Sequence, residues 1–353
     1  MVISTMYPNK TNPTFGIFVK NQVEELIKRG FQVDVAAIKD PRMGTLFVVK
    51  KYFLWMIHII LILLTKGKKY DIVHAHYVFP SGWLALLFKK RFRTRVIATA
   101  HGGDLDKMAK KGPFFFKRTK QILHEADHVI AVGEELKHDM VTMFGVGKKK
   151  ITVLNMGVNR KIFVPMDRAD ARNAINISQN SIIILFVGNI IKAKGITELV
   201  AAYSGLKENH PNIELHLIGP QKEPAFVQEL KSKYNDFNIH PPMNQKEVAK
   251  WMAAADVFVI PSHIEGFGLV ALEAMSCHTS VVGSNVGGLH YLLSDGAGVL
   301  IEPKNKKSLS KGIESVINND SLSNELIING EVKAQRYDQE RLIGQLIKLY
   351  HRG

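Results

Sequence analysis

Short apolar runs alternate with amphipathic stretches along almost the whole chain. Runs rich in valine and isoleucine and bounded by glycine, proline or polar residues predict strands, and the stretches between them predict helices. The predicted strands are MVIST, QVDVAAI, DIVHAHY, RVIATAH, HVIAVG, ITVLNMG, SIIILFVGN, IELHLIGP, FNIH, DVFVIPS, SVVGSN and GVLIEP. The predicted helices cover residues 17–29, 83–88, 197–207, 224–234 and 246–255, with two more that end near residues 126 and 276. Such alternation predicts parallel sheets with helices on both faces.

The alternation occurs in two blocks that are separated by a short polar break. Pro165, within NRKIFVPMDRAD, interrupts the pattern. We therefore expect an α/β protein of two doubly wound, Rossmann-like domains facing a central cleft, with residues 1–163 in the first and 164–336 in the second. In such folds a ligand binds at the carboxyl ends of the strands. The tail YDQERLIGQLIKLY predicts one further helix.

The composition is that of a soluble globular protein. Among the 353 residues, 46% are hydrophobic and 22% are charged. The single cysteine, Cys277, excludes an intrachain disulfide and fits a reducing cytoplasm. Its apolar surroundings predict a small buried hydrophobic residue. The first residues, MVISTMYPNK, have no pattern of a signal peptide.

Positive charge is concentrated in the first half of the chain. Residues 1–165 contain 28 Lys and Arg against 12 Asp and Glu, whereas the remainder contains 19 against 20. An asymmetry of this size indicates a surface that faces an anionic partner. Nucleic acid and an anionic membrane are the two candidates.

One uncharged stretch in this half favours the membrane. Residues 52–65, YFLWMIHIILILLT, are shorter than the roughly 20 residues that span a bilayer. Lysines flank the stretch on both sides: Lys50, Lys51, Lys66, Lys68 and Lys69. A helix lying on a membrane surface and a buried helix of the first domain both fit this pattern, and the sequence leaves the choice open. A second basic cluster, KKGPFFFKRTK at residues 110–120, also favours an anionic surface.

The segment PSHIEGFGLVALEAMSC carries the most specific chemistry. Its turn at Gly266–Phe267–Gly268 lies between an apolar run and an apolar helical pattern. Free N–H groups and the positive end of a helix dipole at such a turn suit a phosphate. Glu265 precedes the helix and Glu273 lies about two turns inside it, so the two are on the order of 12 Å apart along the axis. Carboxylate pairs that act on one glycosidic bond lie about 5–9.5 Å apart, so these two suit opposite ends of a long ligand.

This segment resembles the Glu-x7-Glu motif of glycosyltransferase family 4, whose members are retaining enzymes of the GT-B fold. The resemblance implies that Glu265 contacts the donor sugar and that Glu273 holds the ribose of the nucleotide. The turn that would face the sugar and the diphosphate comprises Gly266, Phe267, Gly268 and Leu269. The resemblance covers nearly the whole chain and implies that the final helix, residues 337–353, packs back on the first domain.

The segment FVGNIIKAKGI resembles the diphosphate-binding loop of the same family. Members carry a glycine–arginine pair and then a lysine–glycine pair; this chain matches at Gly188, Lys194 and Gly195 but has Asn189 in place of the arginine. The resemblance implies that Lys194 neutralises the donor diphosphate. Lys192 or a residue of the first domain is the candidate for the missing charge.

Two segments of the first domain resemble family motifs as well. TAHGGDLD implies that His101 lies near the reacting sugar. The loop after the first strand contains Gly16, which implies a close approach of the backbone to the donor phosphates.

No metal site is expected. Asp104 and Asp106 form a DxD pattern, which binds a divalent ion in a different glycosyltransferase fold, whereas the GT-B resemblance implies a metal-independent reaction. His74 and His76 alternate along a predicted strand and therefore share one face. They lack cysteine or carboxylate partners at the spacing of a metal site.

The resulting hypothesis is a retaining hexosyltransferase that moves a sugar from a nucleotide diphosphate sugar to a hydroxyl of a lipid-linked or cell-surface polysaccharide precursor. Its expected catalytic residues are His101, Lys194 and Glu265, without cofactor or metal. We expect a cytoplasmic protein, peripheral on the inner face of the cell membrane, whose partners include an anionic membrane surface and no nucleic acid. The alternatives are a nucleotide-sugar epimerase or phosphorylase of the same fold, or a basic nucleic-acid-binding protein. A nicotinamide-dependent enzyme is disfavoured because no G-x-G-x-x-G follows the first strand.

Overall fold

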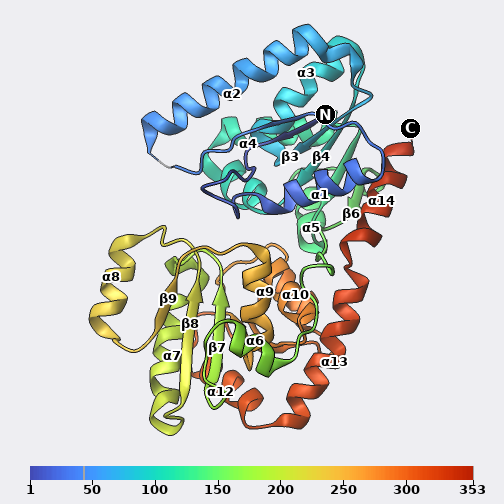
Figure 1. Cartoon of the computed structure of the whole chain (residues 1–353). Coiled ribbons are helices and arrows are strands. Elements are labelled where there is room, and N and C mark those ends of the chain that lie inside the picture. The colour runs from blue at the N-terminus through green and yellow to red at the C-terminus, as the bar shows by residue number, and fades with distance from the viewer. Residues whose placement is uncertain (43, 353) are drawn as a thin grey trace. The chain divides into compact units, whose positions relative to one another are not determined.

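The computed structural model describes residues 1–42 and 44–352, without the side chains of residues 106 and 107, and it divides into two compact units (Figure 1). Unit 1 comprises Met1–Met156 and Glu340–Gly353, and unit 2 comprises Gly157–Gln339. Each unit is built on one six-stranded parallel sheet. The expected α/β architecture of two doubly wound domains is confirmed.

Unit 1 has the strand order β2-β1-β3-β4-β5-β6. Its strands are β1 Val2–Ser4, β2 Val35–Ala37, β3 Ile72–His76, β4 Arg95–Ala100, β5 His128–Ala131 and β6 Ile151–Val153. Its helices are α1 Ile17–Lys28, α2 Thr45–Lys66, α3 Trp83–Phe92, α4 Pro113–Glu125, α5 Glu134–Thr142 and, from Glu340 onward, α14 Gln339–His351. Short helical turns occur at Gly67–Lys69, Val78–Gly82, Asp104–Met108, Ala109–Lys111 and Lys148–Lys150.

Unit 2 has the strand order β12-β11-β10-β7-β8-β9. Its strands are β7 Ile182–Val187, β8 Ile213–Ile218, β9 Asn238–His240, β10 Val257–Ile260, β11 Ser280–Ser284 and β12 Val299–Ile301. Its helices are α6 Arg168–Ala174, α7 Ile196–Asn209, α8 Pro224–Lys233, α9 Gln245–Ala254, α10 Leu269–Ser276, α11 Gly287–Leu293, α12 Lys306–Ile317 and α13 Asp320–Arg336. A short 3-10 turn covers Lys192–Lys194.

The predicted strands match the structure better than the predicted helices do. All twelve predicted strand runs contain a strand of the structure, although several strands are shorter than the runs. The helices α5, α6, α11, α12 and α13 were missed. Helices α6 and α11 have only seven residues each, and in α5, α12 and α13 charged and polar residues interrupt the apolar positions. Helix α2 begins seven residues before the expected start at residue 52, since the apolar pattern continues through Leu46 and Val49.

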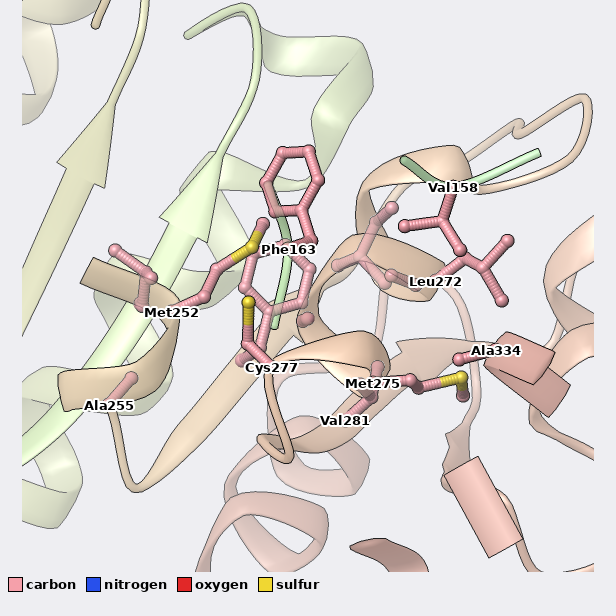
Figure 2. Packing of buried hydrophobic residues seen from close by; sticks show 14 of the residues in the cluster. Val158, Phe163, Met252, Ala255, Leu272, Met275, Cys277, Val281 and Ala334 are labelled. Carbon is pink, nitrogen blue, oxygen red and sulfur yellow. The ribbon is translucent and has the colours of Figure 1, made fainter. Parts of the chain in front are cut away.

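The core of unit 2 lies on both faces of its sheet, as expected for a parallel sheet covered by helices. Along β7, Ile183 and Leu185 belong to one cluster, and the alternating residues Ile184 and Phe186 belong to the other. Figure 2 shows part of the first cluster, in which Cys277 lies beside Phe163 and Met252. Cys277 is 2% exposed, and burial raises the pKa of its thiol to about 12. The prediction of a small buried hydrophobic residue at this position is confirmed.

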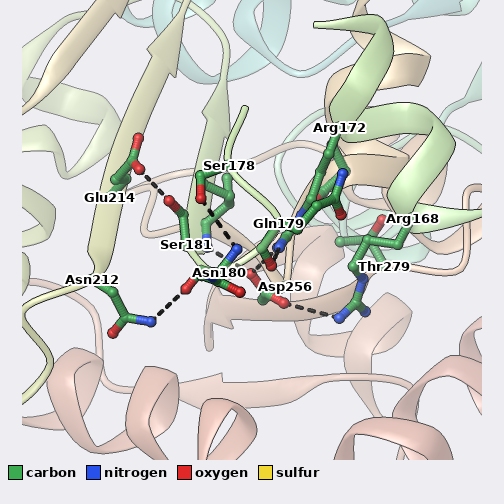
Figure 3. Close-up of polar contacts among 12 residues, drawn as sticks. Arg168, Arg172, Ser178, Gln179, Asn180, Ser181, Asn212, Glu214, Asp256 and Thr279 are labelled. Carbon is green, nitrogen blue, oxygen red and sulfur yellow. Dashed lines mark hydrogen bonds and ion pairs between the residues drawn. The ribbon is translucent and has the colours of Figure 1, made fainter. Parts of the chain in front are cut away.

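A buried ionic network holds α6 against the amino-terminal ends of β7 and β10 (Figure 3). The guanidinium of Arg172 donates to Asp256 at 2.7 Å, and the same carboxylate accepts the backbone N–H of Ile183 at 2.6 Å. Arg168 binds the other oxygen of Asp256 at 2.9 Å. Because the buried arginine is paired and also donates to backbone carbonyls, it does not leave an uncompensated charge in the core.

The final helix, α14, packs within unit 1. Arg29, the C-cap of α1, donates to the carbonyl of Glu340 at 2.9 Å, and Arg95 of β4 donates to the carbonyl of Tyr350 at 2.7 Å. The hydroxyl of Tyr350 lies 2.6 Å from Nδ1 of His74. The first and last segments of the chain thus belong to one folded unit.

Helix α2 differs from every other long helix in its exposure. Of its residues only Trp55 and Ile59 are buried. The interpretation of this stretch as a core helix is therefore wrong for most of its length. Together with the following turn it forms Thr45–Lys69, the one segment among the described residues that is long and apolar enough to cross a membrane by length and composition alone.

Candidate active site

In unit 2 the sheet reverses its strand order between β7 and β10, which are hydrogen-bonded neighbours. β7 leads on to β8 on one side, and β10 leads on to β11 on the other. The loops that follow the two strands therefore diverge at the carboxyl edge of the sheet, which is where open α/β sheets bind ligands. The loop after β7 contains Lys194, and the loop after β10 contains Glu265.

The structure brings these two predicted residues into direct contact. Nζ of Lys194 lies 2.5 Å from Oε2 of Glu265, and the two side chains are 26% and 17% exposed. The hydroxyl of Ser262 donates to the same carboxylate oxygen at 3.2 Å. The backbone N–H of Gly288 in α11 donates to the carbonyl of Glu265 at 3.2 Å and holds the loop in place. A cation and a carboxylate are thus fixed side by side at the ligand-binding edge.

Gly195 allows the two loops to approach this closely. Its φ is +69°, and a Cβ at this position would lie 2.0 Å from the carbonyl oxygen of Pro261. A side chain would therefore push the Lys194 loop away from the Glu265 loop. The glycine match in the sequence has a steric reason that does not depend on any ligand.

The turn Gly266–Phe267–Gly268 leads directly into α10, whose first residue is Leu269. Gly268 is the N-cap, and among the described side chains none caps this helix end. The first N–H groups of α10 are left for another acceptor, and the helix dipole favours an anion there. The geometry expected for a phosphate-binding turn is present in the backbone.

Glu273 lies about one turn inside α10 rather than the expected two, because the helix begins only at Leu269. Burial raises the pKa of this carboxyl group to about 8, and a hydrogen bond from Gln245 opposes the shift. The group is therefore protonated over much of the neutral range in the absence of ligand. A protonated carboxyl group can both donate to and accept from a hydroxyl group.

In unit 2, the remaining residues of the predicted donor site follow β7. Gly188 directly follows β7 and donates its N–H to the carbonyl of Ile218 at 2.9 Å. Asn189 is partly exposed and adds no charge. The side chain of Lys192 is exposed, and the backbone N–H of Lys192 donates to the carboxylate of Glu223 at 3.0 Å. Of the two lysines in this loop, Lys194 is the one held against Glu265.

Sequence reasoning missed a second polar pair beside the first. Nε2 of His263 lies 3.2 Å from Oε1 of Glu198 at the start of α7, and the backbone N–H of His263 donates to the carbonyl of Ala193 at 3.1 Å. This contact ties the same two loops together one residue away from Ser262 and Lys194. The only signal in the sequence was that His263 lies between Ser262 and Glu265.

In unit 1 the corresponding reversal of strand order lies between β1 and β3. His101, which follows β4, contacts His76 at the end of β3: Nε2 of His101 lies 3.1 Å from Nδ1 of His76. The rings of His76 and His74 also stack, with centroids 4.5 Å apart, so the prediction that they share one face is confirmed. Nε2 of His74 lies 2.7 Å from the hydroxyl of Thr99.

These three histidines are neutral. Burial lowers the pKa of His76 to about 3 and lowers the pKa of His74 and of His101 well below the usual value, with the neighbouring rings adding to the effect in the last two. His101 therefore offers one donor and one acceptor nitrogen rather than a positive charge.

Asp104 supports the His101 loop. One of its oxygens accepts the N–H of His101 at 3.0 Å, and the other accepts the N–H of Val78 at 2.9 Å. Burial raises its pKa to about 6 despite these bonds. Both oxygens already have partners in the fold, while the side chain of Asp106 lies outside the described residues. No group of three or more metal-ligating side chains occurs in the part of the chain that the structure describes.

Gly16 lies at the N-cap of α1 with a φ of +73°. A Cβ there would lie 2.6 Å from the backbone carbonyl group of Met6. The glycine therefore lets the loop after β1 fold back on itself at the carboxyl edge of the sheet, in the same kind of position as the loop after β7 in unit 2.

Comparisons with known proteins identify the family of the chain. A sequence profile of the group 1 glycosyl transferases matches residues 167–333, and one of glycosyltransferase family 4 matches residues 16–161. An uncharacterized glycosyltransferase from Methanocaldococcus jannaschii is 30% identical over 285 residues, which cover 79% of this chain and 75% of that protein. The chain belongs to glycosyltransferase family 4.

Other relatives differ in length. The D-inositol 3-phosphate glycosyltransferase of Kribbella flavida is 32% identical over 253 residues, which cover 66% of this chain and 59% of that protein. The chain thus matches less than two thirds of the length of this relative.

Solved structures of glycosyltransferases share the whole fold. A sucrose-phosphate synthase from Thermosynechococcus elongatus superimposes with a TM-score of 0.83 at 24% identity, covering 99% of this chain and 98% of the other. The Anabaena protein HepE in complex with UDP-glucose has a TM-score of 0.79 at 17% identity, with 99% of both chains covered. The predicted GT-B fold is confirmed.

Proposed function

We propose that this family 4 member is a retaining hexosyltransferase. It transfers a sugar from a nucleotide diphosphate sugar to an acceptor hydroxyl. The observation that carries the proposal is the Lys194–Glu265 pair beside the uncapped start of α10. A positive charge and free amides suit a diphosphate, and a carboxylate held next to them suits the hydroxyls of the attached sugar.

The roles of the unit 2 residues follow from their chemistry. As the bond between the anomeric carbon and the diphosphate breaks, negative charge grows on the leaving phosphate, and Lys194 with the amides from Phe267 to Leu269 stabilises it. Glu265 orients the sugar, and Glu273 accepts and donates hydrogen bonds at the ribose. The acceptor hydroxyl forms the new bond on the face that the diphosphate leaves, and its proton passes to the departing phosphate oxygen.

A nucleotide sugar is the donor that similarity to known structures supports. HepE, which shares the fold, binds UDP and UDP-glucose in its solved complexes. Gly188 and Asn189 line the start of the same loop as Lys194 and would contact this donor from the β7 side. His101 and Gly16 would contribute from unit 1, His101 as a neutral hydrogen-bonding group rather than as a cation.

The acceptor is proposed to be a lipid-linked or cell-surface polysaccharide precursor. The excess of Lys and Arg in residues 1–165 and the exposed apolar helix α2 support an enzyme that works at a membrane. We place it in the cytoplasm, peripheral on the inner face of the cell membrane. No metal takes part, because the fold provides Lys194 and the turn amides to neutralise the leaving group.

The test starts from the donor and proceeds to the product. Thermal unfolding in the presence of a panel of nucleotide sugars should identify one that stabilises, by about 2.7 kcal/mol at 100 times its dissociation constant. With that donor and an acceptor, NMR of the product should show the anomeric configuration of the donor retained. Transfer should continue after treatment with a chelator. Donor consumption that does not depend on acceptor would favour an epimerase or phosphorylase, and a product of inverted configuration would contradict the proposal.

A further inference from the structure

The outward face of α2 is apolar, whereas the outward face of a surface helix in a soluble protein is polar. Nine of its large apolar side chains are exposed. Five of them recur at helical spacing and form one stripe, here named the outer stripe: Leu46, Phe53, Ile57, Ile60 and Leu64. A surface helix of a soluble protein carries polar residues on this face. The outer stripe therefore needs an apolar environment outside the unit.

The opposite side of α2 already has its partners. Trp55 donates its indole N–H to the carbonyl of Ala36 in β2 at 3.0 Å, and Trp55 and Ile59 are 6% and 0% exposed. At 100° per residue these two lie roughly opposite the outer stripe. The helix is thus anchored to the sheet by one face and cannot turn the outer stripe inward without breaking that anchor.

The sheet topology decides how α2 can meet a bilayer. α2 connects β2 to β3, and both strands pair with β1, Val2 with Val35 on one side and Val2 with His74 on the other. A spanning helix is surrounded by lipid, and the hydrocarbon core of roughly 30 Å separates the segment before it from the segment after it. Spanning by α2 would therefore strip Trp55 and Ile59 from the sheet and place β2 and β3, which share the neighbour β1, on opposite sides of the bilayer. The helix can only lie in the plane of the membrane surface.

A basic pocket opens beside the amino-terminal half of α2. Its volume is about 460 Å³, and Phe47, Leu54 and Trp55 form apolar parts of its wall. Four basic side chains line it together with one carboxylate: Lys39, Arg42, Lys50, Lys51 and Asp40.

The four basic side chains of this pocket differ in the partners that they have within the protein. Arg42 forms an ion pair with Asp40 at 2.7 Å, and Lys51 donates to the backbone carbonyls of Asp40 and Arg42. Within the described residues, the ammonium groups of Lys39 and Lys50 contact no carboxylate. They are the charges that remain for a ligand.

We propose that α2 lies in the plane of a bilayer with its outer stripe among the acyl chains, and that the basic pocket binds the phosphate of an anionic phospholipid headgroup. This deepens the membrane location proposed above by naming the element, its orientation and the headgroup site. It does not depend on the sugar-transfer chemistry. An in-plane helix buries its apolar face near the boundary of headgroups and acyl chains, which places a pocket at its flank at headgroup depth.

Charge favours lipid over a protein partner as the occupant. Residues 45–69 contain five lysines and no acidic residue. Lys66 and Lys68 at the far end are exposed, whereas Lys69 pairs with Asp34 at 2.7 Å. A second copy of the same helix would bring like charges together at both ends, while an anionic bilayer surface complements them.

Vesicle flotation tests the outer stripe. Phe53→Glu combined with Leu64→Glu changes two side chains that are 55% and 73% exposed, so the fold should remain intact by circular dichroism and thermal unfolding. Binding to vesicles of phosphatidylglycerol and phosphatidylcholine should fall about tenfold or more, because two charges would enter the apolar layer. Ile328→Glu, on α13 of unit 2 and 67% exposed, is the matched control and should bind like the wild type. Unchanged binding of the double variant would overturn the proposal.

Matched charge changes test the pocket. Lys39→Gln with Lys50→Gln should weaken binding to anionic vesicles about three- to tenfold and leave the weak binding to pure phosphatidylcholine unchanged, since each basic residue at the surface contributes separately. Lys148→Gln with Lys149→Gln removes the same charge from an exposed turn of unit 1 and is the matched control. It should lower the logarithm of the affinity for anionic vesicles by less than half as much. Equal effects of the two pairs would exclude a headgroup site. Inorganic phosphate at the concentration of accessible lipid should not release the protein; release would assign the pocket to a free anion.

Depth measurements test the orientation. Single cysteines in place of Leu46, Phe53, Ile60 and Leu64 can be labelled with a fluorophore, because the native Cys277 is 2% exposed. Quenching by nitroxide lipids should place all four labels at one depth. A depth that changes by about 1.5 Å per residue along the helix would mean that it spans the bilayer. A stable dimer in solution without vesicle binding would assign α2 to a second copy of the chain instead.

Discussion

The carboxyl edges of the two sheets have related backbone geometry but differ in charge. The edge in unit 2 carries charged side chains, and the edge in unit 1 carries neutral histidines. In unit 2, loops from the neighbouring strands β7 and β10 bring together an ammonium and a carboxylate that both remain partly exposed. In unit 1, the ends of β3 and β4 bring together His76 and His101, which burial keeps neutral. Partial exposure lets charges persist, whereas full desolvation favours the neutral form of an imidazole.

The difference suggests a division of labour between the two units. The charged edge suits a leaving group on which charge develops, because fixed charges stabilise it most strongly there. The neutral edge suits hydroxyl groups, which need donors and acceptors but no counter-charge. Four predictions test this contrast, from the largest effect to the smallest.

Replacing Lys194 should have the largest effect. Lys194→Ala should lower kcat about 100-fold or more, because a positioned charge next to the departing diphosphate is lost. Steady-state kinetics with saturating donor measure this effect. Lys192→Ala, two residues away in the same loop but exposed, is the control and should stay near the wild type. The opposite result would give the phosphate role to Lys192.

Glu273→Ala should act on donor binding more than on turnover. The KM for the donor should rise about 5- to 100-fold, the range for leaving a buried hydrogen-bonding partner unsatisfied. kcat should change less, because contacts to the ribose are nearly the same before and during reaction. Donor affinity equal to that of the wild type, in a variant that still folds, would remove the ribose assignment.

His101→Ala should have a smaller effect on kcat, about tenfold, as expected for a neutral hydrogen bond. The shape of the pH–rate profile should not change between wild type and variant, because the imidazole does not titrate near neutral pH. If the wild type lost activity as pH rose through about 6.5, the usual pKa of histidine, and the variant did not, His101 would act as a cation and the contrast between the units would fail.

Glu273→Gln should change the way in which the stability of the protein depends on pH, and it should affect activity less. In the folded protein the pKa of Glu273 is about 8, above the ordinary value of 4.5 for this carboxyl group. The unfolded chain therefore binds fewer protons between these values, and wild-type stability falls as pH rises through this window. The neutral amide avoids the loss, so the gain in Tm over the wild type should be about 3 °C or more larger at pH 8.5 than at pH 5. An equal difference at both pH values would mean that the carboxyl group is not desolvated.

Much of the donor site could be predicted because its residues are close together in the sequence. Glu265, the glycine turn and Glu273 lie in one strand–turn–helix segment, and the local pattern is enough to place the turn at the start of α10. The pairing of Lys194 with Glu265 could not be read in this way, since it depends on β7 and β10 being neighbours in the sheet. The pair of His263 and Glu198 has the same origin and was missed.

The sequence by itself determined the two-unit α/β fold and the chemistry of the turn, because strand periodicity, glycine positions and charge are properties of short segments. Only the tertiary structure decided the state of the histidines and the role of α2. Neutral imidazoles require knowledge of burial, to which segments from β3, β4 and α14 all contribute. The apolar pattern of α2 fits a core helix and a surface helix equally well; the sheet decides between them, because Trp55 and Ile59 anchor one face and the outer stripe is left without a partner in its own unit.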